Sequence, residues 1–224
     1  MCKRLLLIQP HSDDVLFSCS HLLFDDECEK DILTIENNSK RIAEDEKLYG
    51  FLGIPFNHLE VEFDDQSYYG YHKKYKEVTI ADSQVWLKEY FGQEKLDEIK
   101  TALKTFLTSY FKKHTGDEII VVAPWGIGHP FHLYVRTLVE SLVMGCIWFY
   151  REFPHSYKKR SQAQVQKQLN EYELIASVSV GEFDDVKWEL AKKFYKSQSS
   201  LLWFEQGYIQ KKLNEELYTI KLPF

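Results

Sequence analysis

The feature that most constrains the fold is a set of short apolar runs separated by amphipathic helical patterns. Several runs are continuous, which is typical of strands covered on both faces of a sheet. They predict strands at residues 4–9, 31–36, 56–62, 118–123 and 146–151. Helical patterns occupy residues 39–52, 94–114, 131–144 and 183–196. This alternation predicts an α/β fold with a mainly parallel sheet and helices on both faces.

The chain has no internal repeat and no obvious linker. Its 224 residues suit one α/β domain, so we expect a single domain over residues 1–224. Residues 64–80 are polar and rich in tyrosine, and we interpret them as a long loop on the working face. The last 25 residues or so are expected to form a helix and a terminal extended segment.

Charge and composition argue against several classes of protein. The net charge is −6 and no basic block stands out, which argues against a nucleic-acid partner. No apolar run reaches the roughly 18 residues of a membrane span, and the first run is too short for a signal peptide. The four cysteines form no CxxC pair, so we expect a reducing, cytoplasmic location, with Cys19 and Cys146 in the core.

Two clusters of chemically active side chains follow predicted strands. His11, Asp13 and Asp14 come directly after the first strand, and His129 and His132 follow the strand at 118–123. Ligands of open α/β sheets bind beyond the carboxyl ends of the strands. The spacing of three places the two later histidines on one face of a helix, if a helix starts there. The two clusters are therefore expected to meet.

Imidazoles and carboxylates that converge in this way suit a metal ion. Zinc in catalytic sites takes three nitrogen or oxygen ligands, and two histidines with one carboxylate also suit ferrous iron. The adjacent aspartates can then divide the work, because one binds the metal and the other accepts a proton from water that the metal activates. Two simpler interpretations stay open. The aspartates can be an ordinary helix cap, and GHPFH can be a turn with a half-buried histidine.

Other hydrolase and cofactor signatures are missing. No glycine-rich loop follows the first strand, which argues against a dinucleotide-binding domain. No GxSxG sequence is present, which argues against a serine hydrolase of the α/β type.

The two clusters resemble the paired motifs of the LmbE/PIG-L family of metal-dependent N-deacetylases. PHSDD at 10–14 stands in the place of the family's (A/P)HPDD, and GHPFH at 128–132 in the place of GHPDH. Further likenesses are R-x-x-E at 41–44, followed by Leu52-Gly53, and VKWELAKKFYKSQ at 186–198. The order and spacing of these motifs match over roughly residues 4–200.

The resemblance implies a Rossmann-like, three-layer αβα domain that hydrolyses an N-acetyl amide, commonly on an amino sugar. Carried over position by position, His11, Asp14 and His132 correspond to the metal ligands, with zinc as the expected ion and iron as the alternative. Asp13 corresponds to the general base. His129 corresponds to a charged histidine that stabilises the intermediate or protonates the leaving amine.

The residues expected to contact substrate are less sharply defined. By the resemblance, Arg41 orients substrate or braces the first loop, and Asp64 faces substrate, with an alignment uncertain by one residue. From its place at a strand end, Arg151 binds a substrate anion or forms a structural ion pair. His155 is a further candidate contact. Sugars stack on aromatic rings, so the tyrosine-rich segment either binds sugar or packs on itself (Tyr68, Tyr69, Tyr71 and Tyr75).

Two departures from the family motifs bear on the chemistry. Ser12 replaces a proline, and Phe131 replaces an aspartate that supports the neighbouring histidine. Without that aspartate, His129 should have a less raised pKa and a less fixed orientation. We therefore expect a lower pH optimum or another partner for His129. The expected substrate is a small N-acyl saccharide. The alternatives are a non-catalytic metal- or sugar-binding protein and an amidase acting on a non-sugar conjugate.

Overall fold

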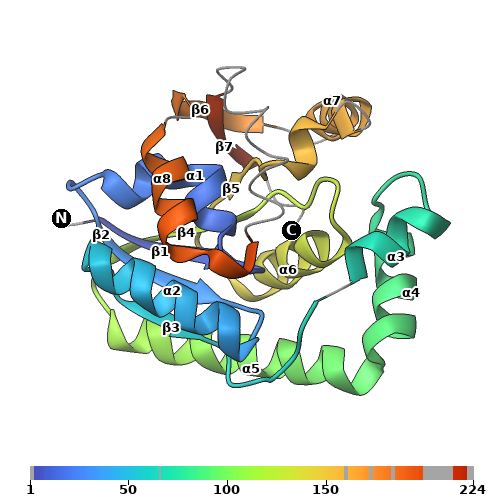
Figure 1. Cartoon of the computed structure of the whole chain (residues 1–224), viewed down its shortest axis with the longest axis horizontal. Helices are drawn as coiled ribbons and strands as arrows, with labels where there is room; N and C mark the ends of the chain where they lie inside the picture. Colours follow the sequence, from blue (N-terminus) through green and yellow to red (C-terminus); the bar gives the residue numbers. More distant parts are fainter. Residues whose placement is uncertain are drawn as a thin grey trace.

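The computed structural model describes residues 3–65, 67–158, 161–171, 174–182, 185–198 and 214–220, and its strands form one mixed sheet. The order of the strands is β3-β2-β1-β4-β5-β7-β6 (Figure 1). The strands from β3 to β5 are parallel, whereas β7 runs antiparallel to both β5 and β6. Their bounds are β1 Lys3–Gln9, β2 Glu29–Thr34, β3 Phe56–His58, β4 Glu118–Pro124, β5 Cys146–Tyr150, β6 Leu174–Glu182 and β7 Asn214–Ile220.

Helices cover both faces of this sheet. Along β1, Leu5 and Leu7 pack in one core with α1, α2 and α8, while Leu6 and Ile8 pack in another with α4, α5 and α6. Apolar residues at successive positions thus serve two cores. The three-layer αβα architecture is confirmed. The helices are α1 Asp14–Phe24, α2 Ser39–Leu52, α3 Ser67–Lys74, α4 Ile80–Phe91, α5 Gln93–Lys113, α6 Pro130–Leu142, α7 Gln162–Glu171 and α8 Asp185–Phe194, with the 3₁₀ helices η1 His155–Tyr157 and η3 Lys196–Gln198.

The order of the strands reverses between β1 and β4. From β1 the chain adds β2 and then β3 on one side, and it returns through α3, α4 and α5 to place β4 on the other side of β1. At such a reversal the connections leave the sheet in opposite directions and open a crevice at the carboxyl ends of the strands. The two loops that begin at this crevice are those that carry His11 and His129.

The region between β3 and α5 differs most from the sequence-based expectation. The predicted strand at 56–62 is only Phe56–His58, and the expected loop at 64–80 contains α3. Helix α4 was not predicted. Its start has a recognisable signal, because the side chain of Thr79 accepts a hydrogen bond from the Asp82 backbone N–H. Its buried stripe is thin, with only Ser83 and Leu87 buried, so periodicity alone indicates it weakly.

The carboxyl-terminal part of the sheet also differs. Strand β6 was not predicted, and it pairs with β7, which is the expected terminal extended segment. The expected helix in the last 25 residues lies outside the described residues. Cys19 is buried, as predicted, but the prediction for Cys146 was wrong, because it is exposed at the first position of β5.

A buried polar cluster around Asp45 supports the loop between β1 and α1. The carboxylate of Asp45 accepts hydrogen bonds from the Tyr195 hydroxyl (2.6 Å), the Thr34 hydroxyl (2.8 Å) and the Gln9 amide (2.8 Å). The side-chain oxygen of Gln9 accepts the backbone N–H of Val15 at the start of α1. Burial raises the pKa of Asp45 to about 7 despite these hydrogen bonds.

This raised pKa predicts a pH-dependent stability. The native state holds the Asp45 proton up to about pH 7, whereas the ordinary pKa is 3.8, so the free energy of unfolding falls as the pH rises between these values. From pH 5 to pH 8 we expect the wild type to lose about 3 kcal/mol more than Asp45→Asn loses. Urea unfolding of both proteins at the two pH values measures this. Equal changes in the two proteins would contradict it.

Candidate metal centre

The loop after β1 holds Asp14 by a local hydrogen bond and places Asp13 in an unusual backbone conformation. The backbone N–H of His11 donates to Asp14 Oδ2 at 2.8 Å, which ties the start of α1 back to the loop. Asp13 has a φ of 87°, a left-handed conformation that non-glycine residues rarely adopt. Such local strain is frequent at functional sites. It makes Asp13 a candidate for a functional role rather than an ordinary helix cap, and its side chain makes no capping hydrogen bond.

The loop after β4 brings two histidines to the same place. Gly126 and Gly128 have φ values of 84° and 79°, and a Cβ on Gly126 would lie 2.7 Å from Leu133 Cα. Only glycine fits this close approach. Helix α6 then begins at Pro130, with His129 as its N-cap and His132 in its first turn.

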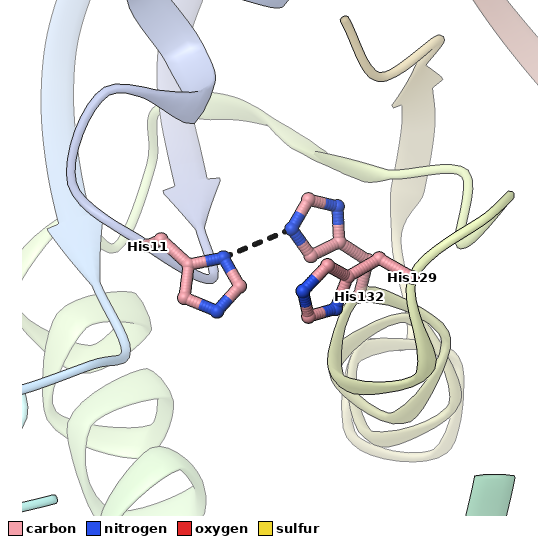
Figure 2. A group of neighbouring side chains, drawn as sticks. All are labelled: His11, His129 and His132. Carbon is pink, nitrogen blue, oxygen red and sulfur yellow. Dashed lines mark hydrogen bonds between the residues drawn. The ribbon is translucent and has the colours of Figure 1, made fainter. Parts of the chain in front are cut away.

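The two loops converge on a small group of buried ligand atoms. Figure 2 shows the His11 ring facing the rings of His129 and His132, which come from the start of α6. His11 Nδ1 lies 3.0 Å from His132 Nε2, and Asp14 Oδ2 lies 3.3 and 3.4 Å from these two atoms. The ligand atoms of His11, His129 and His132 all lie within 4.8 Å of one another. This buried histidine group can hold a metal ion.

The other nitrogen of His11 is held by a carboxylate. His11 Nε2 lies 2.9 Å from Asp65 Oδ2, and Asp65 Oδ1 accepts the backbone N–H of Ser67. Burial alone would raise the pKa of Asp65, but its hydrogen bond with His11 holds it below its ordinary value. A carboxylate at Nε2 fixes the ring and leaves Nδ1 directed at the centre. Sequence reasoning chose the neighbouring Asp64; the Asp-Asp pair was the signal, but nothing in it distinguishes the two residues.

A second carboxylate lies beside His132. Glu152 Oε1 is 3.7 Å from His132 Nδ1, and that nitrogen is buried and has no hydrogen-bond partner among the described residues. The same oxygen accepts the backbone N–H groups of Gly126 and Ile127. Glu152 therefore braces the glycine turn while it faces His132. Glu152 was not predicted as a site residue.

His129 is held differently from the other two histidines. Its Nδ1 accepts the backbone N–H of Phe131 at 3.2 Å, so in the neutral ring the proton is on Nε2. Burial, followed by the neighbouring His132 and His11, holds the pKa of His129 well below its ordinary value. This agrees in direction with the expectation from the missing aspartate. The neutral ring differs from the charged histidine that the resemblance implies.

The aspartate position of the family motif is filled by the core. Phe131 is fully buried, and its ring contacts Phe63 and Phe91 at centroid distances of 5.3 and 6.1 Å. A carboxylate at position 131 would have to be buried against these apolar rings. The partner of His129 is instead the backbone of its own helix.

A cavity of about 350 Å³ opens onto this group. Arg41 and Asp64, both expected to contact substrate, line it. Arg41 also donates to the Ser12 carbonyl at 2.6 Å and lies 3.4 Å from Asp13 Oδ1, so it braces the first loop as well. The other lining residues include His11, Asp14, Phe17, Asn38, Lys40, Asp65, Tyr68, Tyr69, His129, Phe153, Pro154, His155, Lys158, Ser197 and Gln198.

Arg151 is not among the residues that line the cavity. It forms an ion pair with Glu216 at 2.6 Å and lies 4.1 Å from the centroid of the Tyr157 ring. Of its two possible roles, the structure favours the structural ion pair. The four tyrosines of residues 64–80 fall into two groups. Tyr68 and Tyr69 line the cavity, whereas Tyr71 and Tyr75 pack against each other.

Replacing Asp65 with asparagine tests how the centre is oriented. The variant keeps the size of the side chain but loses the charged partner of His11 Nε2. We expect zinc affinity to fall about 10- to 100-fold, the usual cost of losing such a partner. Competition titration with a zinc-sensitive chelator measures it, and Asp64→Asn is the matched control. Equal zinc affinities in the two variants would show that Asp65 does not orient the centre.

A comparison with models of protein families finds no match for this chain, and a comparison with curated proteins finds none either. The resemblance to the LmbE/PIG-L family therefore stays a prediction. Within the described residues, none of the helices combines the length and the apolar character that crossing a membrane requires.

Proposed function

We propose that the protein is a zinc-dependent hydrolase that removes an acetyl or small acyl group from an N-acylated amino sugar or related amine. The observation that carries this proposal is the convergence of His11, Asp14 and His132, of which His11 and Asp14 line the cavity together with Asp13. The motif resemblance to the LmbE/PIG-L deacetylases supports the same reaction.

The ligand atoms fit zinc. Bonds of about 2.0–2.1 Å at tetrahedral angles place two ligand atoms about 3.3–3.4 Å apart. The three atoms of His11, Asp14 and His132 are separated by 3.0, 3.3 and 3.4 Å. Two imidazoles and one carboxylate are also a usual ligand set of catalytic zinc, and ferrous iron accepts the same set.

A zinc ion held there would supply Lewis acidity, polarising the amide carbonyl and making water more acidic. Asp13 is the candidate general base. Its carboxylate lines the cavity, and burial raises its pKa although Arg41 opposes this. A raised pKa suits a group that takes a proton from the attacking water and returns it to the leaving nitrogen.

His129 is the candidate donor to the developing oxyanion. Because its Nδ1 accepts a backbone N–H, its Nε2–H is available to donate a hydrogen bond. Tyr68 stacks on its ring at a centroid distance of 5.1 Å and an interplanar angle of 17°, which limits the orientation of the ring. In this proposal a neutral imidazole stabilises the oxyanion, whereas the family's pattern implies a charged one.

The decisive experiment measures metal and acetate together. The purified protein is analysed for bound metal and then incubated with N-acetylglucosamine and with N-acetylated amines that contain no sugar. We expect about one zinc per chain and acetate release that a chelator abolishes and zinc restores. Release only from the non-sugar amines would identify an amidase of another class. Bound zinc without release from any compound would favour a non-catalytic binding protein.

A further inference from the structure

One part of the cavity wall carries a cationic group that is not among the proposed zinc ligands. Lys158 lines the cavity, and its Nζ donates to the Tyr68 hydroxyl at 3.2 Å and lies 5.2 Å from the centroid of that ring. Among the described residues, no carboxylate pairs with Lys158. A half-buried ammonium group without a counter-ion attracts an anion from solution.

His155 belongs to the same wall. Its ring lies 4.8 Å from that of Tyr68 and 5.0 Å from that of His129, measured between centroids. Its Nδ1 is buried and has no hydrogen-bond partner within the part of the chain that the structure describes. An unsatisfied buried polar atom is costly, and a bound ligand group can satisfy it.

Carboxylates also line the cavity, but each has a partner of its own. Asp13 lies 3.4 Å from Arg41, and Asp65 lies 2.9 Å from His11 Nε2. Asp14 is one of the proposed metal ligands. Lys158 differs because none of the described carboxylates pairs with it, so it can attract an anionic group of a ligand.

We propose that Lys158, the Tyr68 hydroxyl and His155 form a subsite for an anionic group of the substrate, a carboxylate or a phosphate ester. As a statement about substrate, this rests on the proposed function. The subsite adjoins His129, so the anionic group lies close to the acyl group that is cleaved. The favoured substrates are acidic N-acyl compounds rather than neutral N-acyl sugars.

The first test uses binding alone and does not depend on catalysis. Inorganic phosphate is titrated into the chelator-treated protein, and binding is followed by calorimetry. Lys158→Met should weaken phosphate binding about 10- to 100-fold, the usual size of one charge-assisted hydrogen bond. Tyr68→Phe, which removes only the hydroxyl, should weaken it less. Lys73→Met is the control, because Lys73 is exposed on α3 and does not line the cavity.

Equal phosphate affinities in the wild type and Lys158→Met would overturn the proposal. So would a loss in Lys40→Met alone, since this would place the anion at the exposed rim. Near-ultraviolet circular dichroism shows whether each variant is folded, and the Tyr68→Phe comparison remains informative if Lys158→Met is not.

The second test separates carboxylate from phosphate. Acetate release is compared for N-acetylglucosamine and for its derivatives with a carboxylate or a phosphate ester. An acidic derivative should have the higher kcat/KM, and Lys158→Met should reduce that preference about 10-fold or more. No preference for either acid would overturn the substrate claim. Absence of release from every compound would instead refute the proposed function, while the phosphate titration would still decide on the subsite.

Discussion

Asp13→Asn is expected to reduce the rate of acetate release about 10²- to 10⁴-fold while leaving the zinc content near one per chain. General bases contribute rate factors of this size. The amide cannot accept a proton from water, but it has nearly the shape of the carboxylate. Asp13 lies in a left-handed conformation that asparagine tolerates better than most residues, so the loop should keep its geometry.

The measurement combines a steady-state assay with metal analysis of the same sample. The matched control is Asp26→Asn, because Asp26 is exposed beyond the end of α1 and does not line the cavity. A full rate in Asp13→Asn would refute the role of base. A low rate accompanied by lost zinc would instead show that Asp13 holds the metal centre together.

The fold was largely predictable because strands that pack against a core on each face are apolar at successive positions of the sequence. Strand β1 is apolar at successive positions, so a covered strand was expected and was found. Strand β6 and helix α4 were missed for a physical reason. Only two residues of α4 are buried, and β6 has exposed residues at Ser177, Val178 and Ser179, so neither shows a strong pattern of burial.

The site residues that lie close together in the sequence could be predicted, whereas those brought in from distant parts of the chain could not. His11 and Asp14, three residues apart, and His129 and His132, also three apart, follow neighbouring strand ends, so their meeting follows from the topology. Asp65 and Glu152 approach the histidines from other loops, across 54 and 20 residues of chain. No local spacing encodes such contacts, and only the packing of those loops brings them into place.

His132→Gln is expected to abolish zinc binding. Outer carboxylate partners are worth about 10- to 100-fold in metal affinity, so losing a ligand should cost more than about 100-fold. Acetate release should fall with it. Glutamine fills most of the fully buried space of His132, which limits the direct damage to packing.

The effect on stability gives an independent readout of the same event. A ligand bound to the native state alone stabilises it by about 4 kcal/mol when its free concentration is 1,000 times Kd. A chelator should therefore lower the Tm of the wild type and of the control His58→Gln, and it should leave the Tm of His132→Gln unchanged. If the chelator lowers the Tm of all three proteins equally, His132 is not a zinc ligand, and the group formed by His11 and Asp14 binds metal without it.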